Sequence, residues 1–165
     1  MTLKNKRNGE IHIQQVKSAS KELDIIKELF VEYSLSLNEN LCFQRFDEEL
    51  ENPLKKYGEP EGCLLLAYVG NEVAGCVALQ PLSKEGVCEM KRLYVRTEFR
   101  KHGVGEELVV RGLNEATNRG YKKMVLDTLE RLQPAIKLYA KQGFVNTSAY
   151  YQNPLANVVY MEKDL

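Results

Sequence analysis

Hydrophobic residues in the first third of the chain follow the spacing of a short strand and then of a long helix. The segment "IHIQQV", residues 11–16, places its two isoleucines on one face of a strand. Between residues 23 and 37 hydrophobic positions recur at steps of three and four, which is typical of an amphipathic helix. The segment "FDEELENP" predicts a short second helix that begins near Asp47 and ends at Pro53.

The middle of the chain has the pattern of β-strands. "CLLLAYV" and "EVAGCVALQPL" flank Gly70 and Asn71, which predicts a β-hairpin. The next segment, "GVCEMKRLYV", continues the strand pattern. If its alternation is regular, Glu89 shares one face of the sheet with Lys91, Leu93 and Val95, and the intervening residues share the other face.

In the last third helices and strands alternate. Hydrophobic residues from position 104 to 116 mark a helix that ends before Gly120. "KKMVLDT" has the apolar run of a buried strand. "PAIKLYAKQ" is a helix with Pro134 in its first turn and Gly143 just past its end. "FVNTSAYY" and "NVVYMEKDL" predict two final strands.

This order of elements predicts one mixed sheet with helices on its faces, an α+β fold or α/β sandwich. The length of 165 residues suits one domain. We place that domain at residues 10–165, after a flexible segment at residues 1–9. The sequence shows no repeat or long linker that would divide it further.

Composition restricts the classes of partner. The chain has 23 basic and 23 acidic residues, so no overall field attracts it to nucleic acid or to a membrane. No segment resembles a transmembrane span or a secretory signal, and we expect a cytoplasmic protein. With two histidines and no CxxC spacing, no metal is expected. The cysteines, expected to be reduced and mostly buried, are Cys42, Cys63, Cys76 and Cys88.

The segment "FRKHGVGEEL" joins a predicted strand to a predicted helix through a glycine-containing basic loop. A helix N-terminus carries unpaired N–H groups and partial positive charge, and Gly103 and Gly105 would let a ligand approach them. The loop therefore predicts an anion site, and pyrophosphate fits it. Glu106 and Glu107 would compete with a phosphate unless they point away. An ordinary surface loop is the alternative, and the absence of a Walker lysine makes ATP a weak candidate.

Two motifs make the sequence resemble the GNAT superfamily of N-acetyltransferases. "RKHGVG", residues 100–105, is similar to the family's phosphate-loop signature, and "LYAKQGF", residues 138–144, is similar to its later helix motif. The resemblance implies a mostly antiparallel sheet of about seven strands with about four helices. It also implies binding of acetyl-CoA and acetyl transfer to an amine.

The resemblance implies a role for each residue of the phosphate loop. In that family the loop's backbone amides hold the CoA pyrophosphate, and the preceding strand pairs with the pantetheine arm. Carried onto this chain, the cofactor-binding residues are Leu93, Tyr94, Val95, Arg100, Lys101, His102, Gly103, Val104 and Gly105.

The expected chemistry needs a base for the amine and an acid for the departing sulfur. The resemblance places Tyr139 as the general acid, although a tyrosine at helical spacing is also common in packed cores. Glu89 is the candidate base, with a solvated strand glutamate as the equal alternative. A backbone N–H at the strand end, such as that of Val95, could stabilise the thioester oxygen.

Several other residues receive weaker assignments. A covalent route through Cys88 is disfavoured because no base neighbours it in the sequence. Arg92, on the face opposite Glu89 if alternation is regular, is expected to be a salt-bridge partner. Tyr150 and Tyr151 could form an aromatic lip over the acceptor site, but we prefer packing of the last hairpin.

The sequence thus predicts an acetyl-CoA-dependent N-acetyltransferase that acts by direct attack of a primary amine in a ternary complex. The alternative is a non-catalytic acyl-CoA-binding sensor or regulatory module. The acceptor stays open among polyamines, amino acids, aminoglycoside-like drugs, peptide N-termini and protein lysines. A homodimer is possible by resemblance to relatives.

Overall fold

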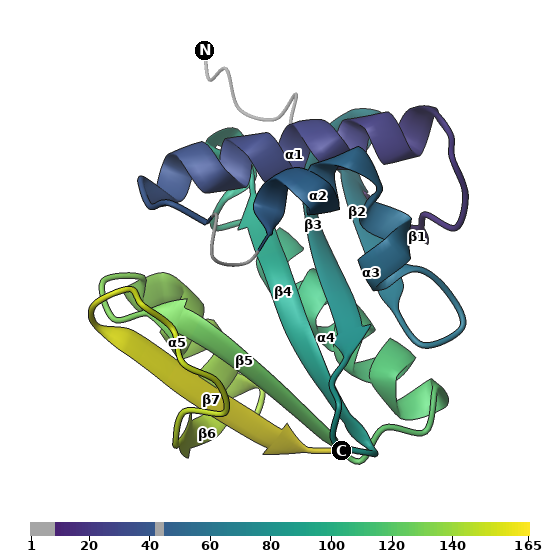
Figure 1. Cartoon of the computed structure of the whole chain (residues 1–165). Helices are drawn as coiled ribbons and strands as arrows, with labels where there is room; N and C mark the ends of the chain where they lie inside the picture. Colours follow the sequence, from purple (N-terminus) through teal and green to yellow (C-terminus); the bar gives the residue numbers. More distant parts are fainter. Residues whose placement is uncertain (1–8, 42–44) are drawn as a thin grey trace.

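A computed structural model of the protein describes residues 9–41 and 45–165. It confirms the α+β sandwich, with one seven-stranded sheet in the order β1-β2-β3-β4-β5-β7-β6 and helices on both faces (Figure 1). Neighbouring strands are antiparallel, apart from the parallel pair β4 and β5. The strands are β1 (Ile11–Gln15), β2 (Cys63–Val69), β3 (Glu72–Pro81), β4 (Val87–Val95), β5 (Lys123–Leu129), β6 (Val145–Thr147) and β7 (Val158–Asp164).

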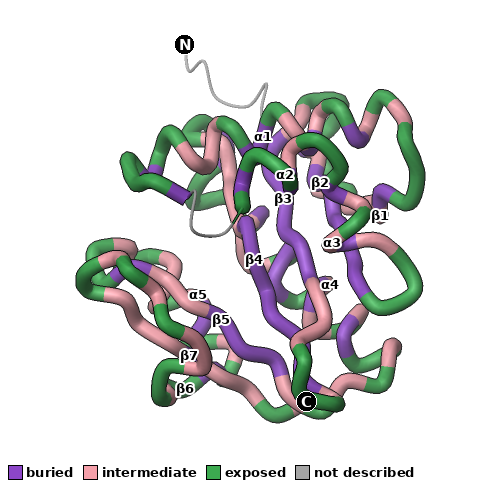
Figure 2. The backbone as a smooth tube through the Cα atoms, in the orientation of Figure 1, coloured by how far each residue is buried: buried purple, intermediate pink, exposed green. Residues whose placement is uncertain are grey.

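Two hydrophobic layers hold the helices to the sheet. One layer packs α1, α2 and α3 on one face, and the other packs α4 and α5 on the opposite face. Figure 2 shows that the buried backbone runs along the central strands between these layers. The helices are α1 (Lys21–Leu37), α2 (Phe46–Glu51), α3 (Pro53–Tyr57), α4 (Val104–Asn118) and α5 (Gln133–Lys141).

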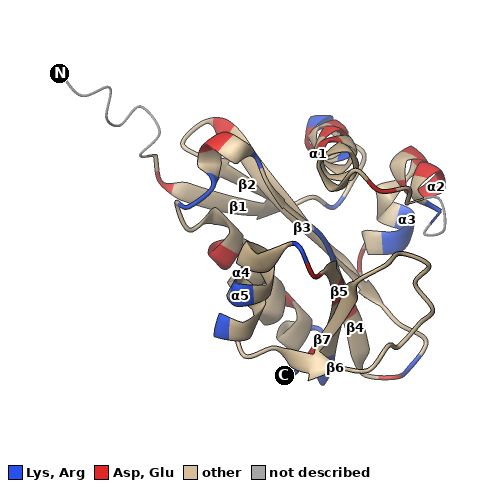
Figure 3. Cartoon of the chain, turned by 90° about the vertical axis from the view of Figure 1, so that its left-hand side faces the viewer, with Lys and Arg blue, Asp and Glu red and all other residues tan. Residues whose placement is uncertain are grey.

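The structure has five helices in its described part, where the sequence predicted about four. The difference lies at Pro53, which was expected only to end a helix. It ends α2 but also occupies the first turn of α3, where its missing N–H costs no hydrogen bond. Acidic α2 and basic α3 lie next to each other (Figure 3).

Several sequence predictions concern the ends and thiols of the chain. Residues 1–8 of the expected flexible segment lie outside the described residues, as does Cys42. Cys63, Cys76 and Cys88 are buried and free, as predicted. Within the described ranges, no helix is long and apolar enough to cross a membrane.

A β-bulge interrupts β4 at Arg92. Lys91 pairs with Ala78 and Tyr94 with Cys76, so two residues of β4 lie opposite one residue of β3. Arg92 has a positive φ of 61°, which is uncommon for a residue with a side chain. The regular alternation expected for this strand is therefore wrong.

The bulge changes which side chains share a face. Leu93 and Val95 pack into the layer under α4 and α5. Arg92 instead bonds to α2, on the other face, which Tyr94 also packs against. Because Cys88 and Met90 also pack under α4, Glu89 lies on the face opposite Leu93 and Val95, and the prediction that it shares their face is wrong.

β4 and β5 separate just before the bulge. Their parallel pairing covers Val87 to Glu89 of β4 and Lys123 to Val125 of β5. From there β5 stays paired with β7 as far as Leu129, and no described strand pairs with the remainder of β4 on the side toward β5. Figure 1 shows the two strands diverging from their meeting point near the C-terminus.

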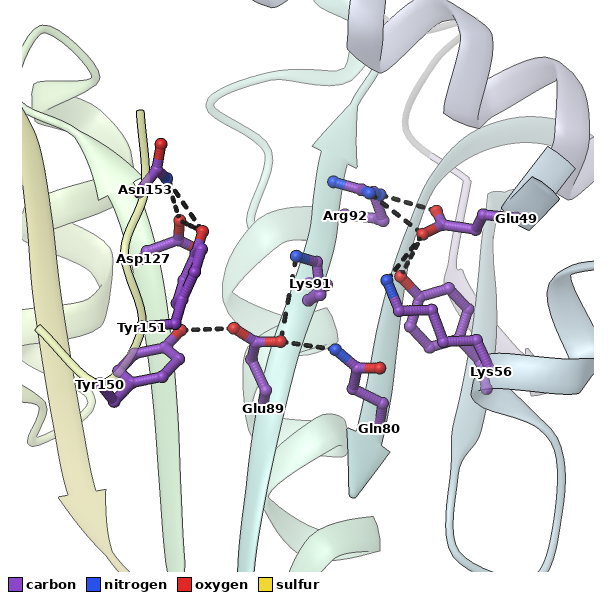
Figure 4. Close-up of polar contacts among 11 residues, drawn as sticks. Glu49, Lys56, Gln80, Glu89, Lys91, Arg92, Asp127, Tyr150, Tyr151 and Asn153 are labelled. Carbon is purple, nitrogen blue, oxygen red and sulfur yellow. Dashed lines mark hydrogen bonds and ion pairs between the residues drawn. The ribbon is translucent and has the colours of Figure 1, made fainter. Parts of the chain in front are cut away.

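A buried ion pair fixes the bulge to α2. The Arg92 Nε donates to Glu49 Oε2 at 2.8 Å, and Nη2 donates to Oε1 at 3.0 Å. Both side chains are at most 2% exposed. The Tyr57 hydroxyl and the Lys56 ammonium also donate to Glu49 Oε1, at 2.8 and 3.1 Å. All three donors therefore converge on one carboxylate (Figure 4).

We expect Glu49→Gln to lower the free energy of unfolding by about 3 kcal/mol, because it leaves the guanidinium of Arg92 buried without a counter-charge. Chemical denaturation measures the change. Glu48→Gln is the matched control on the same helix, since that side chain is 70% exposed, and it should shift stability by no more than about 0.5 kcal/mol. Equal effects of the two substitutions would contradict the assigned role of the buried pair.

The ion pair between Glu49 and Arg92 makes the free energy of unfolding depend on pH. Burial acts to raise the pKa of Glu49, but the hydrogen bonds and charge of Arg92, with Lys56, outweigh it and lower that pKa. A lowered folded-state pKa means that the stabilisation is complete above the ordinary carboxyl pKa of about 4.3 and is lost as pH falls through the folded value. The stability gap between wild type and Glu49→Gln should therefore narrow below about pH 4.

Candidate active site

A cleft of about 530 Å³ opens where β4 has left β5, between the end of β4, the start of α4 and one side of α5. Most of the residues predicted to bind a cofactor line it. His102 does not line it and is exposed, so its side chain lies apart from the site. The predicted residues that line the cleft are Leu93, Tyr94, Val95, Arg100, Lys101, Gly103, Val104 and Gly105.

The start of α4 presents free N–H groups to this cleft. Gly103 precedes the helix in the left-handed conformation, with φ of 86°, and no side chain among the described residues caps this end. A Cβ at Gly103 would have no heavy atom within 4 Å, so the space over the helix start is open. Unpaired N–H groups, partial positive charge and open space together fit an anionic group.

The acidic residues in the first turn of α4, Glu106 and Glu107, leave the helix start open to an anionic group. Glu106, which borders the cleft, pairs with Lys141 of α5 at 3.0 Å and accepts from the Gln142 amide at 3.4 Å. Its charge is therefore balanced on the α5 side. Glu107 is exposed and lies outside the lining of the cleft.

The free edge of β4 also faces the cleft. Successive residues of a strand direct their N–H groups to opposite sides, and the N–H of Arg96 bonds to Ala74 of β3. The N–H groups of Leu93 and Val95 therefore point to the side that β5 has left. The Arg100 side chain already donates to the Val95 carbonyl, at 2.9 Å.

A smaller cavity of about 70 Å³ lies deeper in the separation of β4 and β5. It adjoins the cleft, because Leu93, Leu132 and Ala135 line both. Its polar wall combines groups from α1, from the two diverging strands, from α5 and from the loop before β7. Those polar groups belong to Tyr33, Lys91, Arg92, Asp127, Thr128, Tyr139 and Asn153.

Tyr139 projects from α5 into the lining of this inner cavity. It is 6% exposed, and its ring packs edge-to-face on Phe144 with centroids 5.8 Å apart. No residue in the described part of the chain forms a hydrogen bond with its hydroxyl. Burial raises the pKa of Tyr139, so the hydroxyl keeps its proton at neutral pH. The residue is both packed and available as a proton donor.

Glu89 is buried in a hydrogen-bond network and lines neither cavity. It accepts from the Tyr150 hydroxyl at 2.5 Å and from the Gln80 amide at 2.6 Å (Figure 4). Lys91 Nζ lies 3.9 Å from it. A role for Glu89 as the base stays a prediction, and any proton would have to reach it through Lys91 or Tyr150.

Asp127 is the carboxylate of the inner cavity, and sequence reasoning missed it. Its Oδ2 accepts from the Tyr151 hydroxyl and, at 2.8 Å, from the Asn153 amide, while no described group donates to Oδ1. The available signal was an acid inside the apolar segment "KKMVLDT". Asp127 therefore offers one free carboxylate oxygen to a ligand.

The two tyrosines expected to pack the last hairpin do more than pack. The predicted strand "FVNTSAYY" ends at Thr147, so Tyr150 and Tyr151 belong to the loop before β7. Their rings pack on Tyr160 of β7, with centroids 5.5 and 6.0 Å apart. Their hydroxyls reach the carboxylates of β4 and β5, which ties this loop across the site.

Cys88 lies on the other side of the sheet from this polar network. It packs in the layer under α4, and burial raises the pKa of its thiol to about 12. A thiolate nucleophile is therefore scarce at neutral pH. In the described ranges, no three His, Cys, Asp or Glu side chains group as a metal site.

The sequence matches the Acetyltransferase (GNAT) family over residues 24–144. The chain belongs to this family. A similar protein, named an uncharacterized N-acetyltransferase, from Schizosaccharomyces pombe is 46% identical over 158 residues, covering 95% of this chain and 96% of the relative.

Solved acetyltransferase structures share the fold. An acetyltransferase from Streptococcus agalactiae has a TM-score of 0.77 at 19% identity, with 94% of this chain and 98% of that one covered. An acetyltransferase from Bacillus subtilis, solved in complex with CoA, has a TM-score of 0.65 at 22% identity, covering 94% and 99%. At these identities the likeness concerns the fold alone.

Two buried tyrosines allow a direct test of the free hydroxyl at position 139. Tyr57→Phe removes the donor to Glu49 and should lower the free energy of unfolding by about 1.5 kcal/mol or more. Tyr139→Phe removes a hydroxyl without a described partner, so the change should stay within about 0.5 kcal/mol. Equal losses in denaturant titrations would show that the Tyr139 hydroxyl has a structural partner.

Proposed function

We propose that the protein transfers the acetyl group of acetyl-CoA to a primary amine, by direct attack in a ternary complex. The observation that carries the proposal is that one opening between β4 and β5 joins two features. An uncapped helix start that suits an anion lies at its outer end, and the Tyr139 hydroxyl, free of described partners, lies at its inner end. A CoA sensor would need the first feature and not the second.

The residues around the cleft suit acetyl-CoA. The N–H groups at Val104 and Gly105, with the basic side chain of Lys101, would hold the pyrophosphate. The free backbone edge at Leu93 and Val95 would pair with the amide-containing arm, as an added strand does. When bound, acetyl-CoA supplies an acetyl group activated as a thioester.

The inner cavity then holds the groups that handle protons. An alkyl amine with a pKa of about 10.4 is mostly protonated at neutral pH and must lose a proton before it attacks. Asp127 Oδ1, at the cavity wall, can accept that proton directly, while Glu89 could do so only through a relay. Tyr139 would donate its hydroxyl proton to the departing sulfur, and the Val95 N–H would face the thioester oxygen.

Direct transfer is favoured over an acetyl-enzyme route. Cys88 is packed in the layer under α4, lines neither cavity and has a raised thiol pKa. The two cavities adjoin, so donor and acceptor could meet without a covalent carrier.

The first experiment titrates the protein calorimetrically with acetyl-CoA, CoA and ATP. We expect acetyl-CoA binding that ATP does not match and that Gly103→Glu abolishes, because the new carboxylate would occupy the open space over the helix start. Gly120→Glu is the matched control: Gly120 also has φ of 86° and open space, but it follows the other end of α4. Loss of binding in both variants, or in neither, would count against the assigned site.

The Tyr139→Phe variant distinguishes an acetyltransferase from a non-catalytic acyl-CoA sensor when its acetyl-CoA binding and its activity are both measured. With acetyl-CoA binding retained, thiol release with the best amine of a panel should fall by about 100-fold, since a general acid contributes at least that much. A protein that binds acetyl-CoA but acetylates no amine would support the sensor. Collapse of CoA binding in Tyr139→Phe would make that residue structural.

A further inference from the structure

Lys91 is a buried cation without a hydrogen bond in the described structure. Its side chain is 6% exposed and lines the inner cavity. Its described ion-pair partner is Glu89, whose Oε1 lies 3.9 Å from Nζ, beyond hydrogen-bonding distance. Both oxygens of Glu89 already accept from other side chains, at 2.5 and 2.6 Å. Three N–H donors of an ammonium group are therefore left for another acceptor.

The neighbouring cations show how unusual this is. Arg92, the next residue, makes two hydrogen bonds to Glu49, and Lys56 makes a third to the same carboxylate. Desolvated donors without acceptors are costly, so a buried ammonium in a cavity wall indicates a ligand that completes it. Burial lowers the pKa of Lys91, and Glu89 acts against that effect.

The facing wall of the cavity carries the complementary group. Asp127, on β5, lines the same cavity and has one carboxylate oxygen without a described donor. In Figure 4 the ammonium of Lys91 is directed from β4 toward the side on which Asp127 lies. The cavity thus offers an uncompleted cation and an uncompleted anion on opposite walls.

We propose that the acceptor carries a carboxylate beside its amine, with the carboxylate bound by Lys91 and the amine facing Asp127. This inference rests on the proposed function and names its substrate class, an amino acid. The charged side chains that line the cavity, counted with the ion-pair network behind them, already balance: Lys56, Lys91 and Arg92 stand against Glu49, Glu89 and Asp127.

Charge and size support an amino acid over other amines. A zwitterion keeps the balance of charges, whereas a polyamine would bring uncompensated cations into the site. The cavity of about 70 Å³ is several times what one water molecule needs and suits a small molecule. The remaining wall is apolar and fits an aliphatic side chain; it includes Leu37, Leu41, Leu132 and Leu155.

The test compares L-alanine, L-valine and L-leucine with their amides and their decarboxylated amines. Binding to the CoA-saturated protein is measured by calorimetry, and acetylation is measured by thiol release from acetyl-CoA. For at least one side chain, we expect the amino acid to bind about tenfold or more tightly than the amine that lacks the carboxylate, and to have the higher kcat/KM. Lys91→Met should remove this preference and leave the affinity for the decarboxylated amine within about threefold.

Control variants separate the carboxylate contact from general damage. Lys55→Met is the same substitution on the exposed side of α3 and should leave the preference unchanged. Lys91→Arg should retain part of the preference for amino acids, because it keeps a cation at this position. If Lys91→Met does not fold, Lys91→Gln replaces it as the neutral variant. The inference is overturned if amines without a carboxylate bind as well as amino acids, if none of the amino acids binds, or if Lys91→Met keeps the preference.

The inference and the proposed function can fail separately. If the protein binds acetyl-CoA and acetylates amines that lack a carboxylate as readily as amino acids, the proposed transferase function stands and the amino-acid acceptor is rejected. Lys91-dependent binding of an amino acid, without acetyl transfer, would retain the carboxylate site and reject the transferase.

Discussion

The bulge at Arg92 is the constraint on which the rest of this site depends. It gives the residue a positive φ and directs its side chain to α2, where Glu49 forms two buried hydrogen bonds with it. Pairing between β4 and β5 ends at Glu89, just before the bulge, and no described strand pairs with the part of β4 beyond the bulge on that side. Because β4 and β5 stop pairing, the backbone of β4 has unpaired polar groups in the middle of the sheet. A cavity lies between the two strands at this point.

The opening has different chemistry along its length. Its outer end combines the start of α4 with basic side chains and suits a phosphate, while its middle is lined largely by apolar residues of α5 and β4. Its inner end holds the buried Tyr139 and Lys91 and the partly buried Asp127. Low solvent access strengthens electrostatic interactions and makes each uncompleted donor or acceptor costly, so the inner end would favour a ligand that completes them.

Features fixed by neighbouring residues were predictable from the sequence. The glycine loop before α4, the hairpin at Gly70 and the order of strands and helices follow from local patterns, and the structure has each of them, with α3 as an additional helix. The family resemblance rested on the same kind of local motif. These features need no knowledge of contacts between distant parts of the chain.

Features that depend on distant contacts were not predictable. Alternation misplaced Glu89 relative to Leu93 because the bulge is tied to Glu49, which is 43 residues away from Arg92 in the chain. Asp127 was overlooked because its partners, Tyr151 and Asn153, come from a loop that was expected to continue as a strand. The site lies where three distant segments meet, and no single segment contains its pattern.

Backbone hydrogen exchange with and without acetyl-CoA tests the central claim most directly. If the cofactor binds where β4 leaves β5, it should slow exchange at the N–H groups of Leu93 and Val95 and at residues 103–106, with little change along the paired part of β4. Binding that protects the outer hairpin of β1 and β2 instead, or that leaves the free edge of β4 unprotected, would contradict the account.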